Sequence, residues 1–126
     1  MGKNYASSFI EILIVIAAAE HDIKHLKSYI TDDFTEAELY MIPCESKIRH
    51  EPLGVCAIYS AWNYPIMTAL KPLVQAITAG NAVLVKPSEI APSVSSVIKK
   101  LIDTYLDNEM IKCIEGGVDV AVELNK

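Results

Sequence analysis

The first thirty residues alternate between apolar and polar positions with the period of an α-helix. Apolar side chains recur at alternating spacings of three and four, which places them on one helical face. They are Phe9, Ile12, Ile16, Ala19, Ile23, Leu26 and Ile30. The charged residues that fall off this face are Glu20, Asp22, Lys24 and Lys27. The pattern predicts an amphipathic helix, and because Leu13, Ile14 and Val15 widen its apolar stripe, we expect more than one face to be covered.

Two short apolar runs, residues 55–59 and 82–85, predict strands. Both runs are continuous rather than alternating, which is typical of strands buried on both faces of a parallel sheet. Between them, residues 66–79 predict a helix that stops at residues 80–81, a Gly-Asn pair. Pro72 lies inside this segment and predicts either a kink or the start of the helix.

The rest of the chain continues the alternation of strands and helices. Pro92 is well placed for the first turn of a helix, residues 111–114 predict a third strand, and residues 118–124 predict a further helix. Residues 31–45 are polar and mixed and predict a connection, followed by a short extended segment over residues 46–50. The order is a helix, a linker and then β-α-β-α-β-α, which implies right-handed crossovers and parallel strands.

We therefore expect an α/β fold with a partial, parallel open sheet preceded by an amphipathic helix. Residues 1–50 would form the helix and linker, and residues 51–126 the sheet and its helices. The carboxyl ends of parallel strands meet at one edge, where open α/β sheets bind ligands. The residues gathered at that edge are Ser60, Ala61, Trp62 and Asn63, then Lys86, Pro87, Ser88 and Glu89, then Glu115, Gly116 and Gly117.

Each cluster has a chemical use and a plainer alternative. The Asn63 side chain offers an amide N–H to a developing oxyanion, or the residue is only a turn or helix-cap residue. Lys86 and Glu89 could hold the hydroxyls of a ribose, or form a solvated ion pair that contributes little. Gly116 and Gly117 could let the backbone approach a cofactor closely, or form only a turn.

Other side chains that could carry chemistry have less specific patterns. Trp62 and Tyr64 either belong to the edge or are core aromatics. His21 and His25 have the spacing of two metal ligands on one helical face. No third ligand accompanies them, so we expect a solvated turn and no metal site.

Composition narrows the classes of function. The formal net charge of −5 and pI near 5.1 disfavour a surface for nucleic acid or anionic membrane. Three cysteines without CxxC spacing favour reduced thiols in a cytoplasmic protein. No apolar run is long enough to span a membrane. The mean hydropathy of +0.28 is high for a short chain, and it indicates apolar surface that meets more protein, either a second copy or a partner.

Four motifs in order resemble the aldehyde dehydrogenase superfamily, most closely its class 3 or fatty-aldehyde branch. They are EPLGV from residue 51, AWNYP from residue 61, AGNAVLVKPSE from residue 79 and EGGV from residue 115, and HLKSY from residue 25 is a weaker match. The resemblance implies the first half of a Rossmann-like NAD(P)-binding domain. It also implies oxidation of an aldehyde to a carboxylic acid, with a dinucleotide, NAD or NADP, as cofactor.

The resemblance also implies roles for single residues. Asn63 would donate to the oxyanion of a thiohemiacetal. Lys86 and Glu89 would contact the adenosine ribose, where a carboxylate favours free hydroxyls over a 2′-phosphate. The other residues expected to line the cofactor site are Ser60, Ala61, Trp62, Pro87, Ser88, Gly116 and Gly117.

Parts of the family pattern do not occur before Lys126: the catalytic cysteine, the general-base glutamate and the Gly-rich turn. Cys44, Cys56 and Cys113 do not match the nucleophile's motif, and without a thiolate no thiohemiacetal forms. We therefore expect weak or absent cofactor binding and no turnover by residues 1–126 alone. The chain is then a segment of an aldehyde dehydrogenase, a non-catalytic remnant that folds against a partner, or a lone dinucleotide-binding module, which the missing turn disfavours.

Overall fold

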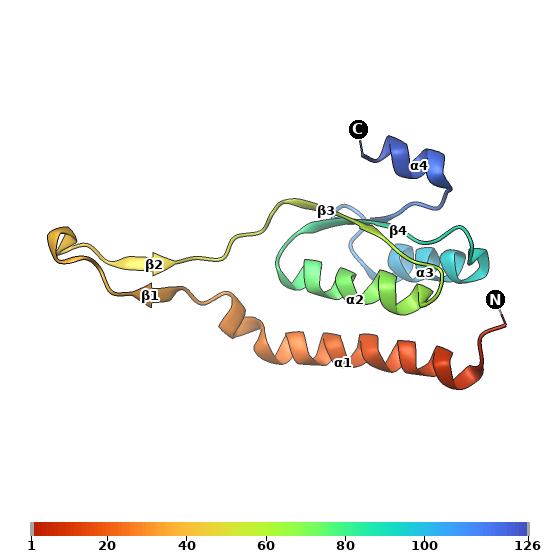
Figure 1. Ribbon diagram of the computed structural model, residues 1–126, viewed down its shortest axis with the longest axis horizontal. Helices are drawn as coiled ribbons and strands as arrows, with labels where there is room; N and C mark the ends of the chain where they lie inside the picture. Colours follow the sequence, from red (N-terminus) through yellow and green to blue (C-terminus); the bar gives the residue numbers. More distant parts are fainter. Residues whose placement is uncertain (1, 126) are drawn as a thin grey trace.

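The computed structural model describes residues 2–125, arranged as a small parallel sheet, a helical layer beneath it, a long helix below that layer, and a two-stranded arm (Figure 1). The elements in chain order are α1 (Tyr5–Tyr29), β1 (Asp33–Thr35), the 3₁₀ turn η1 (Leu39–Met41), β2 (Ser46–Ile48), β3 (Val55–Tyr59), α2 (Pro65–Thr78), β4 (Ala82–Lys86), α3 (Pro92–Tyr105), β5 (Ile111–Cys113) and α4 (Val118–Glu123). The predicted α/β class and the N-terminal helix are confirmed.

The main sheet has three parallel strands in the order β3-β4-β5. Val55 pairs with Ala82 at the start of β3, and Val83 pairs with Ile111 at the start of β5. Each strand is followed by a helix, so the parallel pairing comes from the predicted β-α crossovers.

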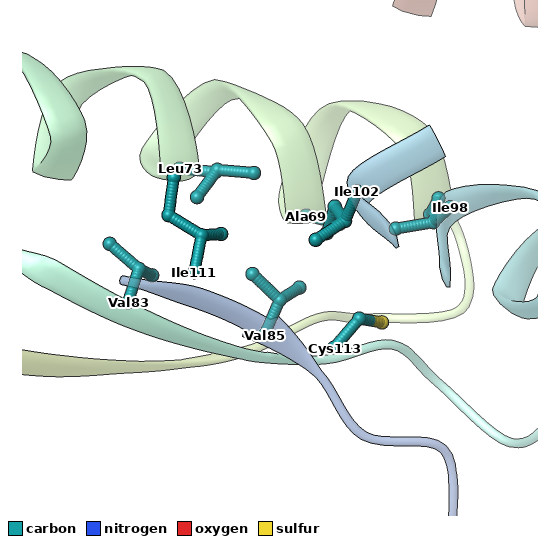
Figure 2. Packing of buried hydrophobic residues seen from close by; sticks show 8 residues of the cluster. All are labelled: Ala69, Leu73, Val83, Val85, Ile98, Ile102, Ile111 and Cys113. Atoms are coloured by element: carbon teal, nitrogen blue, oxygen red, sulfur yellow. The ribbon is translucent and has the colours of Figure 1, made fainter. Parts of the chain in front are cut away.

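The core lies between this sheet and the helices α2 and α3 (Figure 2). The helices α2 and α3 and the strands β4 and β5 each contribute two buried side chains at the spacing of their own period, four apart on the helices and two apart on the strands. The cluster consists of Ala69 and Leu73, Ile98 and Ile102, Val83 and Val85, and Ile111 and Cys113.

Both ends of α2 follow from local sequence. Pro65 begins the helix because its fixed φ suits the first helical position. At the other end Gly80 has φ 81°, its N–H donates to Ile77 O, and Asn81 N–H donates to Ala76 O. These two bonds make a Schellman motif, so the predicted Gly-Asn stop is confirmed. Pro72 lies within the helix and does not begin it.

The face of α1 that packs against the protein differs from the predicted one. The predicted apolar face stays open to solvent, with Phe9 47% exposed, Ile16 48% and Ile23 77%. The face that lies along α2 carries Glu11 and Asp22, whose carboxylates accept hydrogen bonds from residues of α2. The prediction was wrong because apolar residues lie on nearly every side of α1, so periodicity alone could not choose between its faces. Within residues 2–125 no helix, α1 included, is long and apolar enough to cross a membrane.

Two further expectations need correction. The strand β3 is not buried on both faces: its residues alternate between exposed and half-buried, and Val55 is 77% exposed. It is an edge strand, and α2 and α3 cover only one face of the sheet. The polar connection over residues 31–45 contains a strand, β1, which pairs antiparallel with β2, within the predicted extended segment.

The β1-β2 arm projects away from the sheet (Figure 1). Its base is held by charge: Asp32 accepts hydrogen bonds from Lys47 and from Arg49. The hydrogen bonds from Arg49 and Lys47 hold the pKa of Asp32 well below its usual range.

Candidate functional site

The carboxyl ends of the three parallel strands lie at one edge of the sheet, as predicted. Tyr59 pairs with Lys86, and Val85 pairs with Cys113, so the residues that follow each strand leave the sheet together. The Ser60 N–H extends the ladder by donating to Lys86 O at 3.0 Å. The sequence therefore brings its three predicted polar clusters to one edge.

Thr68 of α2 holds the segment that follows β3. Its hydroxyl lies 2.9 Å from Ser60 Oγ and accepts a hydrogen bond from Ala61 N–H at 3.1 Å. Ser60 Oγ also donates to Pro65 O at 3.2 Å. The hydroxyl of Ser60 is thus committed to fixing the turn into α2. Sequence reasoning did not single out Thr68, since a threonine within a predicted helix carries no such signal.

Asn63 lies in this turn with its side chain exposed. Within the described part of the chain, residues 2–125, its side-chain amide has no hydrogen-bond partner. It does not cap α2: the N-cap residue is Tyr64, and no side chain of the cap residue bonds to the helix. Trp62 and Tyr64 are 53% and 44% exposed, so they are edge residues and not core aromatics. The geometry leaves an amide donor available to a ligand.

Lys86 and Glu89 form an asymmetric pair after β4. The Lys86 side chain is 7% exposed and the Glu89 side chain 44%, with 3.0 Å between Nζ and Oε2. Lys86 Nζ also donates to Pro87 O at 3.3 Å. The hydrogen bond from its own backbone N–H, and then the Lys86 ammonium, lower the pKa of Glu89 below 4.5. Because the Lys86 ammonium is buried, its ion pair with Glu89 is not a solvated surface pair.

The chemistry of this pair fits a vicinal diol. An ammonium has three N–H donors, and Lys86 uses two of them on Pro87 O and Glu89 Oε2. One donor remains, beside a carboxylate oxygen of Glu89 that can accept. A ribose with two free hydroxyls can use one donor and one acceptor, so the residues present fit the adenosine ribose of NAD better than that of NADP, in which a phosphate replaces one hydroxyl.

The other residues of the KPSE motif are internal. Pro87 is fully buried, and Ser88 is 6% exposed. Ser88 Oγ accepts a hydrogen bond from Ile90 N–H at 3.3 Å. These contacts shape the turn that carries Glu89 to the edge.

The segment after β5 is held by a carboxylate. Glu115 Oε1 accepts hydrogen bonds from the hydroxyls of Ser95 at 2.8 Å and Ser96 at 3.0 Å, both near the N-terminal end of α3. A Cβ on Gly116 would lie 2.3 Å from Val120 Cγ2. Gly116 therefore lets α4 pack closely on this turn, and sequence reasoning did not single out Glu115 as its anchor.

The cysteines are free, and they lie in three different environments: Cys44 is exposed, Cys56 is half-buried and Cys113 is buried. Burial raises the pKa of the Cys113 thiol to about 11. A nucleophile must be a thiolate near neutral pH, so Cys113 is an inert core residue.

The two histidines of α1 bond to the helix itself. His25 Nδ1 lies 2.8 Å from His21 O, and the two rings stack with centroids 4.2 Å apart. Across residues 2–125 there is no group of three or more His, Cys, Asp or Glu placed to hold a metal ion.

A family model described as "Aldehyde dehydrogenase family" matches residues 1–126. The chain belongs to the aldehyde dehydrogenase family. Its curated relatives include class 3 members, as the motifs predicted. Aldehyde dehydrogenase family 3 member I1, chloroplastic, from Arabidopsis thaliana is 47% identical over 96 residues, which cover 76% of this chain and 18% of that protein. The 4,4'-diaponeurosporen-aldehyde dehydrogenase of Staphylococcus aureus is 38% identical over 94% of this chain and 26% of its own length.

Solved structures of the aldehyde dehydrogenase family share this fold. A substrate-bound Staphylococcus aureus AldH superposes with a TM-score of 0.94 at 36% identity, over 98% of this chain and 27% of that chain. A succinic semialdehyde dehydrogenase from Streptococcus pyogenes, solved with NADP+, has a TM-score of 0.83 at 15% identity over 98% of this chain and 27% of its own, which shows the fold alone. The chain spans about a quarter or less of the length of the relatives that it matches.

Proposed function

We propose that this chain supplies part of the catalytic and cofactor-binding edge of an enzyme that oxidises an aldehyde to a carboxylic acid with NAD or NADP. The observation that carries the proposal is the exposed, unpartnered Asn63 amide on the same sheet edge as the buried Lys86 and its partner Glu89. Membership of the aldehyde dehydrogenase family supports the assignment of this edge to oxidation of aldehydes.

In this proposal the Asn63 side-chain N–H donates to the oxygen of a thiohemiacetal, where negative charge develops as a thiolate adds to the aldehyde carbon. A preorganised donor of this kind stabilises the transition state more than the ground state. None of the described cysteines is suited to be the nucleophile, because Cys113 is buried and Cys56 is half-buried in β3. The exposed Cys44 lies in the β1-β2 arm, which projects away from the sheet. The thiolate would come from polypeptide outside residues 2–125.

Lys86 and Glu89 bind the ribose of the cofactor in this proposal. The free N–H of Lys86 donates to one hydroxyl, and the exposed carboxylate oxygen of Glu89 accepts from the other. NAD or NADP held there would supply the acceptor for the hydride. The remaining edge residues shape this site through their backbone and packing. They are Ser60, Ala61, Trp62, Pro87, Ser88, Gly116 and Gly117.

The test is a chimera in which residues 1–126 replace the matching quarter of Staphylococcus aureus AldH, whose structure guides the junction. We expect NADH or NADPH production from an aldehyde that the unmodified Staphylococcus enzyme oxidises. Asn63→Ala should lower kcat about 10²–10³-fold with little change in KM, as for removal of one oxyanion donor. Glu89→Ala should instead raise the KM for the cofactor. A folded chimera that is inactive, or one that is indifferent to Asn63→Ala, would contradict the proposal.

A second candidate is a non-catalytic segment that associates with a second copy or another protein. The specific observation in its favour is the exposed apolar face of α1, with Ile12 43%, Ile16 48% and Ile23 77% exposed. In this case residues 1–126 sediment as a dimer or larger species, and Ile16→Glu restores the monomer. A monomeric chain that yields an active chimera would rule this candidate out.

A further inference from the structure

The turn that carries Asn63 is held by Lys3, which lies just before the start of α1. Lys3 Nζ donates to the backbone oxygen of Asn63 at 2.9 Å. The same ammonium lies 3.8 Å from the ring centroid of Tyr64, a cation–π contact. Lys3 thus contacts the candidate catalytic residue and the next residue, about sixty positions away along the chain.

The buried carboxylate of Glu11 also holds this part of the chain. Glu11 is 1% exposed and forms an ion pair with Lys3. Its Oε2 accepts hydrogen bonds from Ile66 N–H at 3.0 Å and Met67 N–H at 3.1 Å. These are the second and third residues of α2, whose N–H groups a capping side chain normally satisfies. Because the residue at the N-cap position provides no such bond, α1 caps α2 with a side chain of its own.

We propose that Lys3 and Glu11 are positioning residues for Asn63, which fix its backbone and so direct its amide into the oxyanion site. The proposal rests on the proposed function of Asn63. Between β3 and α2 the chain has no regular secondary structure. The Asn63 amide has no partner of its own within residues 2–125 that would orient it. The bond from Lys3 holds the backbone oxygen of Asn63 itself, and Glu11 fixes the first turn of the helix that follows.

The Asn63 amide must be held in position because an oxyanion donor acts only over a narrow range of distances. An oxyanion donor acts when it lies about 2.7–3.1 Å from the developing charge. A misplacement of about 1 Å, even one caused far from the chemistry, can cost about 10²-fold in rate. A contact that only stabilised the fold would change the amount of active enzyme, and would leave the kcat of each folded molecule unchanged.

The first experiment uses the whole chain of residues 1–126. Trp62 is the single tryptophan and precedes Asn63, so its fluorescence anisotropy reports the order of this turn. We expect Lys3→Met to lower the Trp62 anisotropy, and Glu11→Gln to speed hydrogen exchange at the Ile66 and Met67 amides. Lys24→Met and Glu20→Gln, at exposed positions of α1, are the matched controls and should change neither readout.

The second experiment uses the active chimera with Staphylococcus aureus AldH. Lys3→Met should lower kcat about 10–100-fold, with KM within about twofold. Lys3→Arg should keep most of the wild-type kcat, because arginine can still donate to Asn63 O and to the Glu11 carboxylate. Asn63→Ala combined with Lys3→Met should be no slower than Asn63→Ala alone, since Lys3 acts through Asn63. Circular dichroism of each variant confirms that equal amounts are folded.

The outcomes separate the two proposals. If Asn63→Ala slows the chimera but Lys3→Met does not, the positioning role is wrong and the role of Asn63 stands. If Asn63→Ala leaves kcat unchanged, the proposed function itself is wrong, whatever Lys3→Met does. Additive losses in the double variant, or an equal loss in Lys24→Met, would also overturn the positioning role.

Discussion

The two strand ends that carry the candidate chemistry are built in opposite ways. After β4, Lys86 bonds to Pro87 O and Glu89 Oε2, so its partners lie one and three residues away in the chain. After β3, the turn that carries Asn63 depends on Lys3 and on α2, and the bond from Lys3 joins residues sixty positions apart. The turn after β4 is therefore held by contacts within itself, whereas the turn after β3 is held by Lys3 and by Glu11 of α1.

Because of this difference, the two turns should respond differently to substitutions in α1. A local turn keeps its geometry as long as its strand forms, because its contacts need no other element. A turn held across elements depends on the docking of α1 along α2. Changes in α1 should therefore act on Asn63 and leave the Lys86–Glu89 pair intact.

The largest expected effect is that of Glu11→Ala. Removing the carboxylate leaves the Ile66 and Met67 N–H groups without acceptors and leaves Lys3 without its ion-pair partner. We expect the free energy of unfolding to fall by about 2–4 kcal/mol, measured by urea denaturation. Glu20→Ala on the exposed side of α1 is the control and should lie within about 0.5 kcal/mol of the wild type. A loss in Glu11→Ala no larger than in this control would mean that α1 does not hold the β3 end.

The same contrast explains what could be predicted from sequence. The Gly80 stop of α2 and the Pro92 start of α3 are encoded within a few residues, and local patterns predicted them. The gathering of three strand ends followed from the crossover rule, which needs only the order of elements.

The parts that could not be predicted depend on which surfaces meet. Glu11 interrupts an apolar run in the sequence, and nothing local indicates that it is buried against the start of α2. The covered face of α1 is chosen by this contact and not by the apolar stripe. The exposure of β3 follows from its place at the sheet edge, whereas an apolar run alone favoured burial on both faces.

A substitution at the third strand end sharpens the comparison. Gly116→Ala would place a Cβ 2.3 Å from Val120 Cγ2, so α4 must shift away from the turn. We expect a loss of about 1–3 kcal/mol in the free energy of unfolding, measured by thermal denaturation, and faster hydrogen exchange confined to α4. Gly54→Ala is the comparison for backbone strain alone, because Gly54 has φ 103° but no atom within 4 Å of its added Cβ. Equal losses in both variants would show that backbone strain alone, without contact with α4, explains the effect at Gly116.

A smaller effect is expected for Thr68→Val, which changes the β3 end without touching α1. The variant keeps the shape of the side chain but loses the bonds of its hydroxyl to Ser60 and Ala61. We expect a loss of about 1–2 kcal/mol, measured by urea denaturation, together with a lower Trp62 anisotropy. Thr104→Val on the exposed side of α3 serves as the control. If Trp62 anisotropy is unchanged in Thr68→Val, the contacts from α1 alone are sufficient to order the turn.

The smallest effect is expected at the β4 end, and it is visible only through pH. The pKa of Glu89 lies below its ordinary value of 4.5, first because of its own backbone N–H and then because of Lys86. A depressed carboxylate contributes stability above its ordinary pKa and loses it as the pH falls through the folded-state pKa. Wild type should therefore be slightly more stable than Glu89→Gln near neutral pH. The difference should decrease as the pH falls below 4.5 and vanish below the folded-state pKa of Glu89. Urea midpoints measured across this range, with Glu109→Gln as the exposed control, check the sign. A stability difference that grew in acid would mean that the fold destabilises the Glu89 carboxylate. The turn after β4 would then not be stabilised by its own contacts, and the contrast with the turn after β3 would fail.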